Sequence, residues 1–67
     1  MEIQKARRVS TQLLTVQDVV ERTRLSKQYV YALIDRGELP AHRFGAAVRV
    51  DVADLEAFIA ARRTVAA

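Results

Sequence analysis

The chain has 67 residues, of which 51% are hydrophobic and 28% charged, and 11 basic against 8 acidic residues give a net charge of +3. This length allows one domain with a small core and leaves little room for a deep catalytic pocket. The absence of cysteine excludes disulfides and thiolate zinc sites, and the sequence contains neither a signal-peptide pattern nor a transmembrane stretch. A single soluble, cytoplasmic domain is therefore expected.

Residues 1–12 have no sustained hydrophobic period and mix basic with small polar side chains. They are predicted to form a flexible N-terminal arm that carries Lys5, Arg7 and Arg8. Ordered structure is expected over residues 13–63, and residues 64–67 are expected to be a flexible tail.

Three helix starts share one local pattern, in which an apolar residue precedes a capping residue and a second apolar residue lies four positions after the cap. The capping residues are Thr15, Ser26 and Asp51. Asp18 lies at the third position of the first helix, where a capping box places an acceptor side chain. The sequence therefore predicts helices that begin after residues 15, 26 and 51.

The second predicted helix runs from Ser26 to Arg36 and places Val30, Leu33 and Ile34 on one face. Gly37 is a suitable residue to end it, and Pro40 follows shortly after. The third helix is expected to bury Leu55, Phe58 and Ile59 and to carry Arg62 and Arg63 in its last turn, where positive charge suits the helix dipole.

Between these two helices, AHRFGAAVRVD has two short alternating runs around Gly45, Ala46 and Ala47, a pattern typical of a β-hairpin. The alternation predicts that Phe44, Val48 and Val50 face the core and that Arg43 and Arg49 point outward. A sharp turn between the first two helices followed by such a hairpin is a winged helix-turn-helix, a mainly α fold with a two-stranded wing and a C-terminal helix.

Exposed polar and aromatic residues gather at the start of the second helix, away from its apolar face: Ser26, Lys27, Gln28, Tyr29 and Tyr31. In a helix-turn-helix this end enters the DNA major groove, where Gln can pair with adenine and Lys can reach guanine or phosphate. Basic residues near the turn and on the wing would face phosphates: Arg22, Arg24, Arg43 and Arg49. The alternative is a solvated surface on which the tyrosines cover the edge of the core.

Nothing in the chain predicts catalysis. A lone histidine in a strand, His42, is more often packed or solvated than catalytic, and Asp18, Asp51 and Asp54 are explained by helix capping. No nucleophile elbow, glycine-rich phosphate loop or HExxH motif is present. No enzymatic activity, cofactor or metal ion is expected.

Four segments occur along the chain in the order LLTVQDV, LSKQYVYALIDRGELPA, RFG and VRVDVADLEAFI. Through these segments the sequence resembles the excisionase family of winged helices, compact relatives of the DNA-binding domain of MerR-type regulators. The resemblance implies sequence-specific double-stranded DNA binding, with the second helix in the major groove and the wing on the backbone or minor groove. The chain departs from the family pattern at Arg24, where relatives commonly have glycine, at Ala32, and at the uncharged wing tip of residues 46–48.

The resemblance favours a phage or mobile-element recombination directionality factor that binds repeated attachment-site sequences, bends DNA and assists a site-specific integrase in excision. The absence of an effector domain or a long dimerisation helix in these 67 residues agrees with that hypothesis. Two alternatives stay open, a stand-alone MerR-like transcriptional regulator and a protein-interaction adaptor that does not bind DNA. Head-to-tail self-association on DNA is expected for the first hypothesis.

Overall fold

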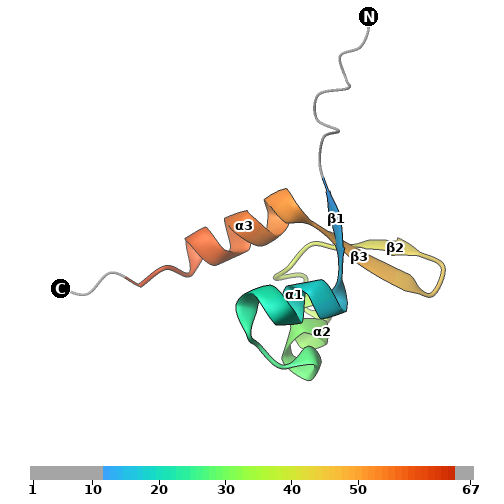
Figure 1. Ribbon diagram of the computed structural model, residues 1–67, viewed down its shortest axis with the longest axis horizontal. Helices are drawn as coiled ribbons and strands as arrows, with labels where there is room; N and C mark the ends of the chain where they lie inside the picture. The colour runs from blue at the N-terminus through green and yellow to red at the C-terminus, as the bar shows by residue number, and fades with distance from the viewer. Residues whose placement is uncertain (1–11, 65–67) are drawn as a thin grey trace, which may run out of the picture.

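The computed structural model describes residues 12–64, and these residues form helices around a small antiparallel sheet (Figure 1). The elements in chain order are β1 (Leu13–Thr15), α1 (Val16–Thr23), α2 (Lys27–Asp35), β2 (His42–Phe44), β3 (Ala47–Asp51) and α3 (Val52–Ala61). The predicted winged helix-turn-helix architecture is confirmed. Nearly all of the predicted arm and tail lies outside the described residues, so the division into arm, domain and tail stays a prediction.

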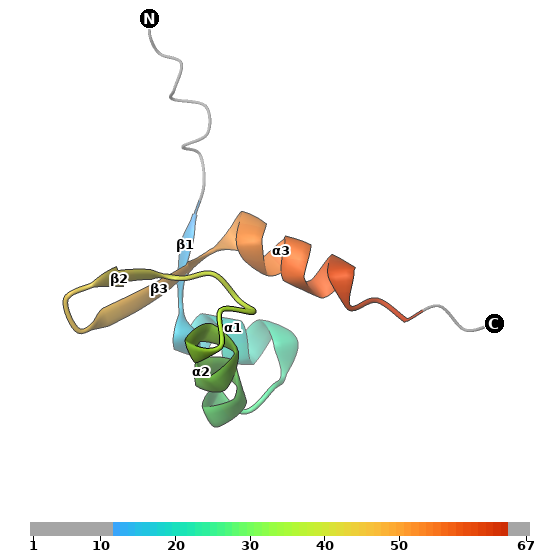
Figure 2. The same ribbon diagram turned by 180° about the vertical axis from the view of Figure 1, so that it is seen from behind.

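The sheet contains a third strand, β1, that the sequence did not predict. The sheet order is β1-β3-β2, and β1 pairs antiparallel with β3, with Leu14 opposite Val50. Three residues are too few to show alternation, and the partner strand lies more than thirty positions away along the chain. Figures 1 and 2 show the β2–β3 hairpin and α3 extending to opposite sides of β1.

All three predicted helix caps are present. The Thr15 hydroxyl accepts from the Asp18 amide at 3.0 Å, and Asp18 Oδ2 accepts in return from the Thr15 amide at 3.0 Å, which completes the capping box. The Ser26 hydroxyl accepts from the Tyr29 amide at 3.1 Å, and Asp51 accepts from the Ala53 amide at 2.8 Å. Each helix therefore begins where its local sequence indicates.

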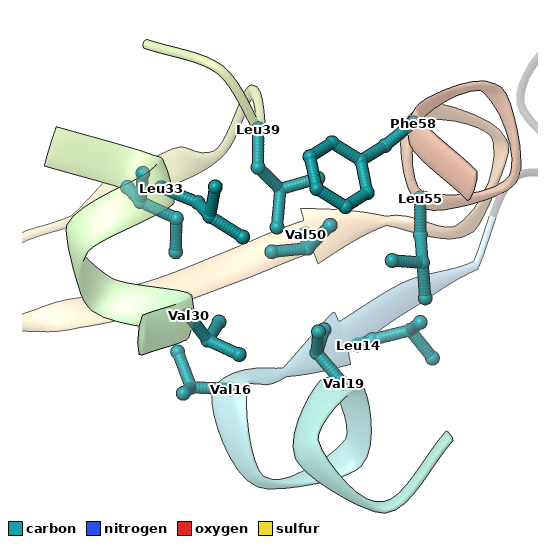
Figure 3. Close-up of a cluster of buried hydrophobic side chains, with 10 residues drawn as sticks. Leu14, Val16, Val19, Val30, Leu33, Leu39, Val50, Leu55 and Phe58 are labelled. Carbon is teal, nitrogen blue, oxygen red and sulfur yellow. The ribbon is translucent and has the colours of Figure 1, made fainter. Parts of the chain in front are cut away.

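The core joins side chains from every element except β2 (Figure 3). Val30 and Leu33 of α2 are fully buried, as is Val50 of β3. Leu39 lies in the turn after α2, which contains Gly37 at φ 76°, and is 1% exposed. Its burial was not predicted from the sequence. The remaining buried residues are Leu14, Val16, Val19, Ile34, Leu55 and Phe58. These contacts hold α2 against α1 and the sheet.

Phe44 corrects one expectation, because its side chain is 57% exposed and does not enter the core. The hairpin turn contains only Gly45 and Ala46, so Phe44 pairs with Ala47 and shares that residue's side of the sheet. A turn that also included Ala47 would have placed Phe44 opposite Val48, on the buried side. A shift of one residue in register moves a side chain to the other face, and the turn length decides the register.

The end of α3 corrects a second expectation. Ile59 was predicted to be buried and is 48% exposed, while Leu55 and Phe58 are buried as predicted. The helix ends at Ala61, so Arg62 is its C-cap and Arg63 lies beyond it rather than in the last turn. Helical period places Ile59 beside Phe58 but cannot say how far the neighbouring elements extend along α3.

Candidate nucleic-acid interface

The turn between α1 and α2 takes a left-handed backbone conformation at a bulky residue. Arg24 has φ 64° and ψ 21°, and its amide donates to the Val20 carbonyl at 2.7 Å. The Thr23 hydroxyl donates to the Val19 carbonyl at 2.7 Å and accepts from the Leu25 amide at 3.2 Å, which keeps the turn short. Glycine is usual at such a position, and Arg24 is one of the places where the sequence departs from the family pattern. The arginine adopts the geometry that glycine would otherwise supply.

The start of α2 presents the polar and aromatic residues predicted for the interface. Lys27, Gln28 and Tyr31 are all exposed, whereas Val30 and Leu33 on the opposite face are fully buried. Ser26 is also exposed, although its hydroxyl is engaged in capping the helix. The buried residues fix the rotation of α2, and that rotation directs the polar side toward solvent.

Tyr29 and Tyr31 do not share one side of α2. Both are 43% exposed, but residues two positions apart on an α-helix point in nearly opposite directions. Tyr31 lies on the same side as Lys27 and Gln28, while Tyr29 lies on the other flank of the helix. The structure therefore groups Lys27, Gln28 and Tyr31 and separates Tyr29 from them.

The two wing arginines lie on opposite faces of the hairpin. Arg43 is opposite Val48 in the register, and Arg49 is opposite His42. Arg43 is exposed, and its Nη2 lies 3.5 Å from Asp35 Oδ1 at the end of α2. Arg49 is half-buried, and its Nη1 donates to the Val48 carbonyl at 2.9 Å. The register thus places Arg49 on the outer face, as predicted, whereas Arg43 lies on the same face as buried Val50 and is nevertheless exposed.

The basic residues near the turn take different positions. Arg24 is exposed within the turn itself. Arg22, in the last turn of α1, lines a groove together with residues from the end of α3. Within residues 12–64 neither arginine forms an ion pair, and the same holds for Lys27. No acid of the described fold is therefore in direct contact with these three charges.

Most of the described ion pairing instead involves Glu38. Arg36 Nε lies 3.0 Å from one carboxylate oxygen and Arg62 Nη2 lies 2.9 Å from the other. The hydrogen bond from Arg36 holds the pKa of Glu38 below its ordinary value and raises the pKa of Arg36. This cluster connects the segment after α2 with the end of α3.

His42, Asp51 and Asp54 approach one another on the outer side of the sheet, with possible ligand atoms within 4.8 Å of each other. These three side chains are the ones in residues 12–64 that could together hold a metal ion. Asp51 also caps α3, and Asp54 lies in its first turn, as the sequence predicts. Sequence reasoning missed the approach of His42, because strand register alone brings it there.

Comparison with known proteins identifies related chains. The family described as "Helix-turn-helix domain" matches residues 13–63. Two Mycobacterium tuberculosis proteins, "Putative DNA-binding protein MT0521" of strain CDC 1551 and "Putative DNA-binding protein Rv0500A" of strain H37Rv, are each 48% identical to this chain over 46 residues. The alignment covers 69% of this chain and 59% of each relative, so it spans about three fifths of those proteins.

No solved structure matches the chain. Among the described helices, none has both the length and the apolar composition that a membrane crossing requires.

Proposed function

The chain belongs to this family of helix-turn-helix DNA-binding domains, and we propose that it binds double-stranded DNA sequence-specifically, with the start of α2 in the major groove. The observation that carries the proposal is the two-sided character of α2. Val30 and Leu33 are fully buried, while Lys27 and Gln28 on the exposed side have no described acid paired with them. A helix held in this orientation can present its exposed side chains to the edges of the base pairs in the groove.

Base reading is assigned to the residues grouped on the exposed side of α2. The Gln28 amide can donate to adenine N7 and accept from adenine N6, and Lys27 can donate to guanine or to a phosphate. Tyr31 can donate its hydroxyl to a phosphate or pack against a thymine methyl group. Ser26 and Tyr29 are the remaining proposed contacts of this helix, with Tyr29 placed to meet the backbone at the edge of the groove.

Phosphate contacts are assigned to Arg22, Arg24, Arg43 and Arg49. Arg24 lies at the turn that precedes α2, so a phosphate beside the major groove is within its reach. On the wing, Arg43 and Arg49 are proposed to contact phosphates of the adjacent DNA backbone. The uncharged tip at Ala46 adds little electrostatic attraction, so the wing contribution rests on these two side chains.

At the finer level, we propose that the chain is an excisionase-like recombination directionality factor. In this role several copies bind adjacent repeats head to tail, bend the DNA and act together with a site-specific integrase. The resemblance of residues 13–63 to that family supports the role, and a single module of this kind buries only about 600–1,000 Å² on DNA. Several copies would share a bending cost on the order of 1–6 kcal/mol per site.

Footprinting of the full chain on the DNA around its own gene tests both levels of the proposal. Repeated protected sites inside a recombinase attachment region support the excision role. One protected promoter would instead indicate a stand-alone regulator. No protection at low salt, together with no gel shift on any fragment, would contradict DNA binding and favour an adaptor.

Gel shifts on fragments with one, two and three tandem sites test head-to-tail binding. Affinity per site is expected to rise with the number of sites, because neighbouring copies contact each other through different surfaces. Equal affinity per site on all three fragments would contradict head-to-tail binding. A stable dimer of the free protein, measured by analytical sedimentation without DNA, would contradict it as well.

A further inference from the structure

A groove of about 520 Å³ lies between the end of α1 and the end of α3. Its lining residues are Arg22, Thr23, Leu25, Phe58, Ile59, Ala60, Arg62 and Arg63. Ile59 is 48% exposed here, in contrast to the fully buried apolar residues of α2. The groove therefore exposes apolar surface at the end of α3.

One wall of the groove is held in place by contacts within the fold. The Arg62 guanidinium carbon lies 3.9 Å from the centre of the Phe58 ring, and Arg62 Nη2 lies 2.9 Å from Glu38. The aromatic ring and the ion pair together fix the position of Arg62. Because the wall is already ordered, a ligand that binds here would lose less free energy in ordering it.

The rim of the groove carries positive charge. Arg62 is paired with Glu38, but Arg22 and Arg63 form no ion pair within residues 12–64. An apolar floor between two such guanidinium groups is complementary to a segment with apolar side chains and flanking carboxylates. Residues 1–12 carry Lys5, Arg7 and Arg8 against Glu2, so the charge of this segment does not complement the rim. The rim also disfavours a second copy of a chain whose net charge is +3.

We propose that this groove docks a short acidic, amphipathic segment of a partner protein. Two or three apolar side chains on one face of the segment contact Leu25, Phe58 and Ile59. Carboxylates at its edges pair with Arg22 and Arg63. This surface is separate from the exposed side of α2, so a partner can be held while α2 is engaged elsewhere. The inference concerns a different ligand class from the proposed DNA interface, and the groove shares Arg22, but none of the α2 residues, with that interface.

The test is selection from a displayed library of random 16-residue peptides against the immobilised full chain. Enriched peptides are expected to combine apolar residues at helical spacing with a net negative charge. Their affinity should fall about tenfold or more for Ile59→Ser, because loss of a central apolar contact removes at least 1.4 kcal/mol. Leu13→Ser is the matched control, since Leu13 is 44% exposed on β1 and should leave peptide binding unchanged.

Arg63→Ala tests the charge requirement. It should weaken the acidic peptides several-fold and reduce the salt dependence of their binding. Circular dichroism of each variant confirms that the fold is retained. The assay contains no DNA, so its result does not depend on whether the proposed DNA binding is correct.

Four results would overturn the proposal. The first two are enrichment of peptides without acidic residues and no enrichment at all. The others are equal peptide affinity for Ile59→Ser and the parent chain, and concentration-dependent self-association that Ile59→Ser abolishes. The last result would identify a second copy of the chain as the occupant.

Discussion

Arg43 Nη2 lies 3.5 Å from Asp35 Oδ1, so the wing is connected to the end of α2 by an ion pair on the surface. Both side chains are mostly exposed, at 59% and 71%. A pair of this kind contributes little to stability, about 0.2–1 kcal/mol. Its larger consequence is electrostatic, because Asp35 neutralises a cation that the proposed interface would direct to a phosphate.

Asp35→Asn should therefore release Arg43 for DNA. The expected result is an affinity increase of up to about fivefold on all sequences, equivalent to about 1 kcal/mol, with a steeper salt dependence. Filter binding at several salt concentrations measures both quantities. In an Arg43→Ala background the gain should shrink, since the two residues act as a coupled pair. An equal gain in that background would show that Asp35 repels DNA directly.

Gln28→Ala should lower discrimination between cognate and altered sites by about 1–3 kcal/mol, if the amide reads one adenine as proposed. Affinity for random DNA should change much less, because that component comes from phosphate contacts. Site selection from a random DNA pool provides the measurement. Gln17→Ala on the exposed side of α1 is the matched control. An unchanged site preference for the Gln28 variant would remove this residue from base reading.

Arg24→Gly and Arg24→Ala separate the backbone and side-chain roles of this residue. Glycine has no β-carbon and adopts the left-handed conformation at φ 64° without strain. The glycine variant should therefore be more stable than the alanine variant by about 1 kcal/mol. Both variants lose the same charge, so their DNA affinities should fall equally if Arg24 contacts a phosphate. Urea unfolding and filter binding measure the two effects. Equal stability of the two variants would indicate that the turn relaxes to another conformation.

Phe44→Ala and Val50→Ala test the observed hairpin register. Val50 is fully buried, and truncating it should cost about 2–3 kcal/mol of unfolding free energy. Phe44 is exposed, and its ring stacks on that of His42 with the two centroids 6.2 Å apart, so its truncation should cost no more than about 1 kcal/mol. Denaturant titration distinguishes these values. A large loss for Phe44→Ala would mean that this side chain belongs to the core.

Asp18 should make stability depend on acid pH. The Thr15 amide that donates to it holds the pKa of this carboxyl below its ordinary value of 3.8. Because the folded pKa is the lower one, the contribution is fully present above the unfolded value and is lost as pH falls through the folded pKa. The stability difference between the parent and Asp18→Asn should therefore be constant near neutral pH and shrink below pH 3.8. A difference that persists unchanged into strong acid would show that the charge of Asp18 is not involved; Glu21→Gln is the control on the same helix.

The amino-acid sequence by itself determined where the helices begin and which side of α2 is buried. Thr15, Ser26 and Asp51 each accept a hydrogen bond from an amide two or three residues ahead, so the information for each cap lies within one turn of chain. The exposure of Lys27 and Gln28 follows from the 3.6-residue period that buries Val30 and Leu33. Local geometry is sufficient for both predictions.

Only the tertiary structure decided the remaining features. The pairing of β1 with β3, the side of the sheet that Phe44 occupies and the ion pair between Arg43 and Asp35 join segments that no local pattern relates. The exposure of Ile59 depends in the same way on how far α1 and its following turn extend along α3. Caps and helical period are set by neighbours in the chain, whereas strand register and burial are set by which distant elements meet. For that reason the exposed side of α2 could be predicted from the sequence, and the groove beside α3 could not.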